Sequence, residues 1–143
     1  MKKMELVVQK DWQDIYTIDR SKNDSRAMFI GDIQSFFAWN DKWVLETIDN
    51  IIIEGINLRK KNNYLATYNP CIINNKLFYF FENNDGKVHI SYNDEKFPNT
   101  YDQIIHYECC EPGVCNPRHN SNMISFFALK GGYWYYVEAG IYK

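Results

Sequence analysis

The residues best suited to chemistry lie between positions 106 and 119, where histidines and cysteines are interleaved with glutamates. Thiolate and imidazole side chains are the ligands that tetrahedral zinc prefers. The candidate metal ligands are His106, Cys109, Cys115 and His119. Their spacing, H-x2-C-C-x4-C-x3-H, matches no standard paired zinc motif. We therefore expect free cysteines and no cofactor, and keep a small zinc protein or zinc enzyme as the alternative hypothesis.

Other catalytic signatures are missing from the sequence. It contains no phosphate-binding glycine motif, no G-x-S-x-G and no H-E-x-x-H. Asp49 and Glu54 form a candidate carboxylate pair, but we assign them to a solvated helix face because charged side chains avoid burial. Cys71 is expected to fill the core and not to act as a nucleophile. We therefore expect a protein that is not an enzyme.

The segment from Glu82 to Glu111 is acidic and rich in aromatic residues. It carries a net charge of −5 within a chain whose total is −2, so the remaining residues sum to +3. Aromatic rings anchor protein interfaces and carboxylates steer a basic partner toward them. The predicted partner-binding residues are Glu82, Asp85, Asp94, Glu95, Tyr101, Asp102, Glu108 and Glu111. The competing interpretation is that the acids only solubilise exposed strands.

The elements that position these residues fall into two halves. Asn40 is a candidate N-cap, and the apolar spacing after it predicts a helix over about 41–61, preceded by another over about 26–38. The second half predicts an antiparallel sheet of about five strands. Its expected segments are a hairpin of 76–82 with 87–92, a strand over 101–108, and a hairpin of 123–130 with 133–141. The fold class expected is α+β, with N-terminal helices packed on a C-terminal sheet.

Length and composition limit the classes of protein. The chain has 143 residues, which suits a single domain over 1–143. A net charge of −2 argues against general binding to nucleic acid or to a membrane surface. The longest apolar runs have five residues, too few for a secretion-signal core or a membrane span. We therefore expect a cytoplasmic protein with reduced thiols.

This profile favours a domain whose function is to bind another protein. An acidic surface imitates nucleic acid, and many secreted bacterial toxins are basic nucleases. The leading hypothesis is a bacterial immunity protein that occludes the active site of a basic toxin domain. A third hypothesis, a small-molecule pocket between the helices and the sheet, is neither supported nor excluded.

Overall fold

The computed structural model describes residues 5–10, 13–19, 33–106 and 116–141. Nearly all regular structure in these residues is antiparallel β-strand, and their only α-helix is the short α1 (Leu58–Asn62). The first two strands, β1 (Glu5–Lys10) and β2 (Gln13–Asp19), pair with each other as a two-stranded sheet.

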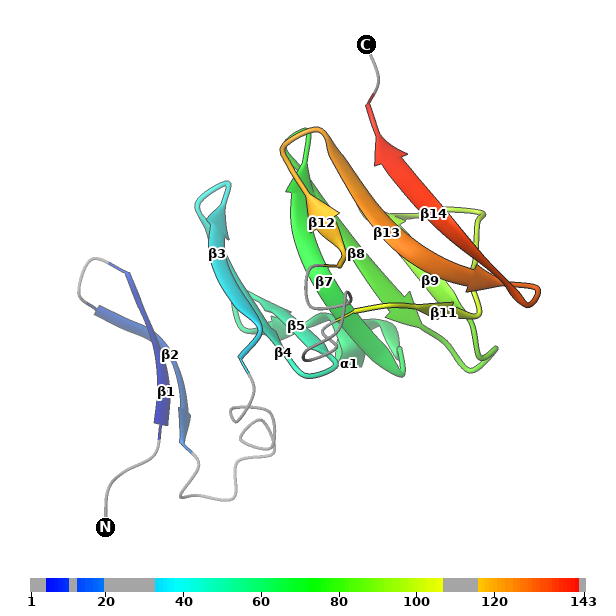
Figure 1. The fold of residues 1–143 in the computed structure, drawn as a ribbon. Helices are drawn as coiled ribbons and strands as arrows, with labels where there is room; N and C mark the ends of the chain where they lie inside the picture. The colour runs from blue at the N-terminus through cyan, green and yellow to red at the C-terminus, as the bar shows by residue number, and fades with distance from the viewer. Residues whose placement is uncertain (1–4, 11–12, 20–32, 107–115, 142–143) are drawn as a thin grey trace.

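Three further sheets are each built from one contiguous stretch of chain (Figure 1). The outer sheet, in order β3-β4-β5-β6, contains β3 (Ser35–Trp39), β4 (Lys42–Thr47), β5 (Asn50–Ile53) and β6 (Ile56–Asn57). The middle sheet, in order β10-β9-β8-β7, contains β7 (Ala66–Ile73), β8 (Lys76–Glu82), β9 (Val88–Tyr92) and β10 (Glu95–Lys96). In the aromatic sheet, β13 (Met123–Lys130) pairs on one side with β11 (Gln103–Ile104) and β12 (Arg118–His119), and on the other with β14 (Tyr133–Gly140).

The three sheets stack as layers, with the middle sheet covered on both faces. Phe78 and Phe80 of β8 face the aromatic sheet and pack against Phe126 of β13. The alternate residues Tyr79 and Phe81 face the outer sheet. Because successive side chains of a strand point to opposite faces, a strand buried on both faces reads as a continuous apolar run. The sequence Leu77 to Phe81 is such a run, and all of it is buried.

The α+β prediction is wrong, and the helix over 41–61 is its largest error. That segment forms β4, β5 and β6, with α1 only at its end. Asp49, Glu54 and Gly55 adopt φ of 58°, 50° and 81°, left-handed values that interrupt an α-helix and form turns between strands. α1 ends at Asn63, which adopts a left-handed conformation as its C-cap.

The predicted helix over 26–38 is wrong where the structure describes it. Residues 33–34 are not helical and 35–38 belong to β3, while 26–32 lie outside the described residues. Asn40 is not an N-cap. It forms a turn with Asp41 between β3 and β4, with φ of 48° and 59°. Both residue types tolerate this backbone conformation, which explains why an asparagine signal suits either feature.

Both hairpins predicted in the second half are confirmed, but they lie in two different four-stranded sheets, so the prediction of one sheet of about five strands is wrong. β8 pairs with β9 around Gly86, and β13 pairs with β14 around Gly131 and Gly132. The strand predicted over 101–108 is shorter, because β11 covers only Gln103–Ile104 and the last two predicted positions lie outside the described residues.

Candidate partner-binding site

A pocket of about 250 Å³ opens at the end of the layered sheets where the β4–β5 turn meets β7. Its described lining residues are Gln34, Glu46, Thr47, Ile48, Asp49, Tyr68 and His106. Two of these residues, Glu46 and Asp49, are carboxylates. We call this feature the acidic pocket.

Glu46 forms the buried wall of the acidic pocket. It is 0% exposed and lies on β4 between the buried residues Leu45 and Thr47. One carboxylate oxygen accepts a 3.0 Å hydrogen bond from Ser35 Oγ, and the other accepts a 2.7 Å bond from the Asn69 amide. Asn69 lies where the β7–β8 register shifts, just before Pro70. Glu46 therefore satisfies an amide that the bulge removes from the ladder.

Asp49 lies at the exposed rim, on a turn that is tied to β7. The Asp49 carbonyl oxygen accepts a 3.0 Å bond from the Thr67 amide, and Thr67 Oγ1 accepts a 2.9 Å bond from the Ile51 amide. The side-chain amide of Asn50 donates to the Ile48 carbonyl oxygen within the same turn. These bonds hold the turn in place, so the Asp49 carboxylate has a defined position at the pocket mouth.

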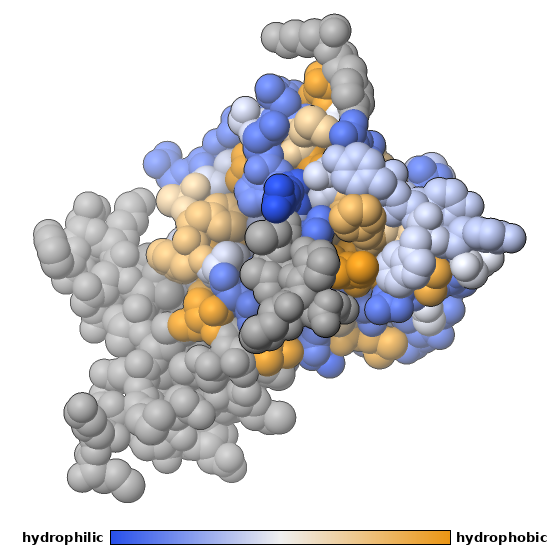
Figure 2. Space-filling model, in the orientation of Figure 1, coloured by the Kyte–Doolittle hydropathy of each residue, from blue (hydrophilic) through white to orange (hydrophobic). Residues whose placement is uncertain are grey.

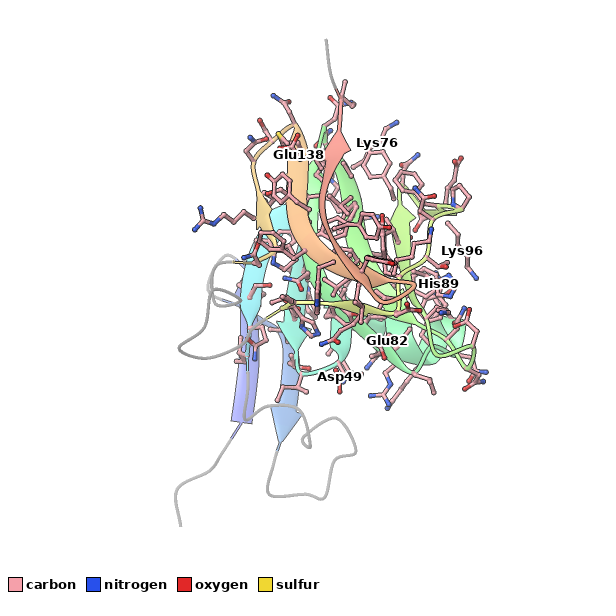
Figure 3. The ribbon with its side chains drawn as sticks, turned by 45° about the vertical axis from the view of Figure 1, so that its right-hand side comes forward. Asp49, Lys76, Glu82, His89, Lys96 and Glu138 are labelled. Carbon is pink, nitrogen blue, oxygen red and sulfur yellow. The ribbon has the colours of Figure 1, made fainter. Side chains whose placement is uncertain are left out.

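Tyr68 and His106 form the opposite wall. Their rings stack with centroids 4.1 Å apart and planes 6° from parallel. The Tyr68 hydroxyl donates to Glu82 Oε1 at 3.2 Å, which brings a third carboxylate close to the pocket. Burial raises the pKa of Tyr68 far above its ordinary value, and the charges of Glu82 and Asp49 raise it further. Figure 3 shows Asp49 and Glu82 toward the same end of the molecule, away from Lys76 and Glu138.

The arrangement is suited to bind a cation. Carboxylates at short range favour a positive group, and partial burial lowers the screening by water. Thr47 adds a hydroxyl to the lining: it is 2% exposed, and its Oγ1 has no hydrogen-bond partner among the residues that the structure describes. An arginine or lysine side chain carries the several N–H donors that such a pocket accepts.

The structure divides the predicted acidic surface between two ends of β9. Asp85 and Asp102 lie with Glu82 at the end that holds the acidic pocket, because they flank the β8–β9 turn and the Val88–Tyr101 bridge. At the other end of β9, Asp94 lies in the turn and Glu95 is the first residue of β10.

Two of these carboxylates already have partners within the chain. Asp102 accepts from the Lys87 ammonium and from the Gly131 amide, and Asp85 contacts His89 Nε2 at 2.7 Å. Tyr101 is only 7% exposed and packs on Phe126, so it contributes to the core. Glu108 and Glu111 lie outside the described residues.

The candidate zinc ligands are described only in part. His106 and His119 both lie along the edge of β13 but line different pockets, and Cys109 and Cys115 lie outside the described residues. In the part of the chain that the structure describes, no group of three or more potential ligand side chains could hold a metal. Cys71 is buried as predicted, and burial next to Glu46 raises its thiol pKa to about 12.

Sequence reasoning missed Glu46 and assigned Asp49 to a helix face. A strand interpretation of residues 42–47 places Glu46 among buried neighbours, and an acidic residue in such a run is a signal of a structural or binding role. The Ile48–Asp49 pair followed by Asn50 is a turn signal between two β-branched runs. Both signals were hidden by the helical spacing.

No family model matches the chain, and no curated protein or solved structure is significantly similar to it. Across the described residues, no helix has the length and apolar character needed to cross a bilayer.

Proposed function

We propose that this protein binds and inhibits a basic protein partner, as a bacterial immunity protein that occludes the active site of a nuclease-type toxin domain. The acidic pocket is the observation that supports the proposal. Its lining includes the exposed Asp49, and Glu82 lies beside it through Tyr68.

The proposed mechanism is electrostatic and steric. A nuclease active site holds cationic side chains that bind phosphate, and one such side chain enters the acidic pocket. The carboxylates of Asp49 and Glu82 replace the phosphate as its counter-charge, and the body of the domain then blocks the substrate. Charges of opposite sign also accelerate encounter, so association should slow as salt is added.

The proposal locates the protein in the cytoplasm, where an immunity protein meets its toxin before secretion. The free thiol of Cys71 is compatible with a reducing compartment.

The test begins with the reading frame next to the gene, where the proposal expects a toxin with a basic catalytic domain. The purified chain should inhibit that domain, and raising the salt concentration should lower the association rate. The double variant Asp49→Asn, Glu82→Gln should weaken binding by about 10- to 100-fold, the loss expected for one charge-assisted contact. Asparagine tolerates the positive φ of 58° at position 49, and glutamine still accepts from Tyr68, so the fold is retained.

The matched control is Asp94→Asn, Glu95→Gln, which removes the same charge at the far end of β9. This variant should bind nearly as the unmodified chain does. Equal weakening by both double variants would show that only net charge matters, and selective weakening by the control would move the contact surface away from the acidic pocket.

A further inference from the structure

The last strand of the aromatic sheet, β14, has an open edge. In the described residues it pairs only with β13, through a two-residue turn that makes Lys130 and Tyr133 a hydrogen-bonded pair. From Tyr133 onward, the backbone groups of every second residue of β14 therefore form hydrogen bonds with β13. The hydrogen bond from the Ile141 amide to the Asn122 carbonyl oxygen continues this alternation. The residues whose backbone groups point away from β13 are Trp134, Tyr136, Glu138 and Gly140.

This edge lacks the protection that exposed strands carry. Monomeric proteins cover such edges or place lysine, proline or bulges on them. β14 is eight residues long, its only charged residue is Glu138, and it contains no proline. Its aromatic side chains are largely in water, with Tyr133 72%, Trp134 51%, Tyr135 49% and Tyr136 58% exposed. In Figure 2 the surface over β14 is pale, between the hydrophilic and hydrophobic extremes.

We infer that the open edge of β14 is a dimer interface, at which it pairs antiparallel with β14 of a second copy of this chain. The register that uses the whole strand places the two-fold axis at Val137. It sets Tyr136 opposite Glu138 of the second copy and Trp134 opposite Gly140 of the second copy. The two Glu138 carboxylates do not face each other, so this register has no like-charge pair directly opposite. A ring opposite an edge glycine covers backbone that is otherwise exposed.

The same register fills an apolar pocket on the inward side of β14. The pocket has a volume of about 280 Å³, and its apolar lining includes Ile73, Phe78, Tyr92, Phe97, Ala139 and Ile141. Tyr135 of the second copy lies opposite Ala139, on the face of β14 that borders the pocket. Because the axis is two-fold, each copy gives a ring and receives one. The interface is therefore self-complementary, as a two-fold dimer requires.

The area available matches that of a stable dimer. An aromatic side chain buries about 150–250 Å² when fully covered, so the exposed parts of the four rings amount to roughly 450 Å² per copy. Two copies offer roughly 900 Å² of exposed ring surface next to the shared edge, and the backbone edge and the pocket add to it, which is of the order of the approximately 1,000 Å² that a specific interface needs. The inference does not depend on the proposed function, because β14 contributes no described residue to the acidic pocket.

The first test measures the mass of the full chain in solution by sedimentation over a wide range of concentration. A cysteine variant that can cross-link the two copies accompanies it. The unmodified chain should reach dimer mass. Val137→Cys should form a disulfide between copies under mild oxidation, since paired residues without mutual hydrogen bonds have Cα atoms about 4.5 Å apart. The matched control Ala139→Cys lies opposite Tyr135 and should cross-link no more than the unmodified chain. A monomer at every concentration, or equal cross-linking of both variants, overturns the inference.

The second test uses the sign of a charge at position 136. Tyr136→Glu places a carboxylate directly opposite Glu138 of the other copy, and the two-fold axis produces this like-charge pair twice. This variant should weaken the dimer about tenfold, whereas Tyr136→Lys places a cation opposite Glu138 and should keep the dimer. Both variants change an exposed side chain, and circular dichroism checks that each is folded. Equal dimer affinity for the two variants overturns the proposed pairing, because the register predicts opposite effects.

Discussion

The double burial of the middle sheet can be tested by removing one large side chain from each of its faces. Phe80 and Phe81 are neighbours in β8, both are 0% exposed, and they point to opposite layers. Replacing either by alanine should lower the free energy of unfolding by about 3–5 kcal/mol, the cost of a buried phenylalanine and the cavity it leaves.

The packing around the two rings supports equal costs. Phe80 lies edge-on to Phe126 with centroids 5.0 Å apart, and Phe81 stacks on Tyr64 at 4.1 Å. In a two-layer protein one face of the middle sheet would be in water. Substituting the phenylalanine on that face would then cost as little stability as Phe127→Ala. Phe127 is 38% exposed, and we expect its substitution to cost about 1 kcal/mol or less.

The assay is equilibrium unfolding in urea, followed by tryptophan fluorescence. A stability of about 5–15 kcal/mol is ordinary for a domain, so an alanine variant can lie near the limit of folding. Phe80→Leu and Phe81→Leu then give the same comparison at a smaller cost. A change at position 81 no larger than that at position 127 would refute the three-layer arrangement.

Two further predictions concern ionisable groups. Since burial raises the pKa of the Cys71 thiol to about 12, we expect it to react with a thiol reagent at neutral pH only as fast as the chain unfolds, and labelling in the folded state would contradict its burial. The Lys87 ammonium and the Gly131 amide lower the pKa of Asp102, so its contribution to stability is present above its ordinary pKa and is lost as the pH falls through the lowered value. The melting temperature of Asp102→Asn should therefore fall less on acidification than that of the unmodified chain. An identical dependence of melting temperature on pH in the two proteins would exclude this role.

The two hairpins of the second half were predictable because their turns contain glycine. Gly86, Gly131 and Gly132 mark the two confirmed hairpins, and the strands beside them are rich in aromatic residues. The first half turns instead through asparagine and acidic residues. Asn40 and Asp49 both have positive φ, but the same residue types also cap helices or lie on solvated helix faces.

Helical spacing was misleading because β4 and β5 of the outer sheet are buried on both faces. Val44 faces the middle sheet, while Trp43 and Leu45 form a separate buried cluster. Apolar residues then occur at almost every position, and some of them fall on a 3.6-residue period by chance. Length and turn residues were the better guide, since no apolar run here exceeds what one strand needs.

The candidate site was predictable only in its chemistry. The acidic character of the second half pointed to Glu82, which does lie beside the acidic pocket. Glu46 and Asp49 come from the first half, and strands far apart in sequence bring them to Tyr68 and His106. A contact of this kind depends on the pairing of layers, which periodicity within one segment does not specify.

The construction of each sheet from one contiguous stretch has a consequence for how the chain folds. Its strand partners are mostly neighbours in sequence, so most of the ladder can form by closing short loops. Docking of the formed sheets is then the step that brings residues distant in sequence together. We expect this step to be slow, because long-range contacts have a large entropic cost. The kinetic signature expected is fast hairpin formation followed by a slower, cooperative burial of β8 between its two neighbours.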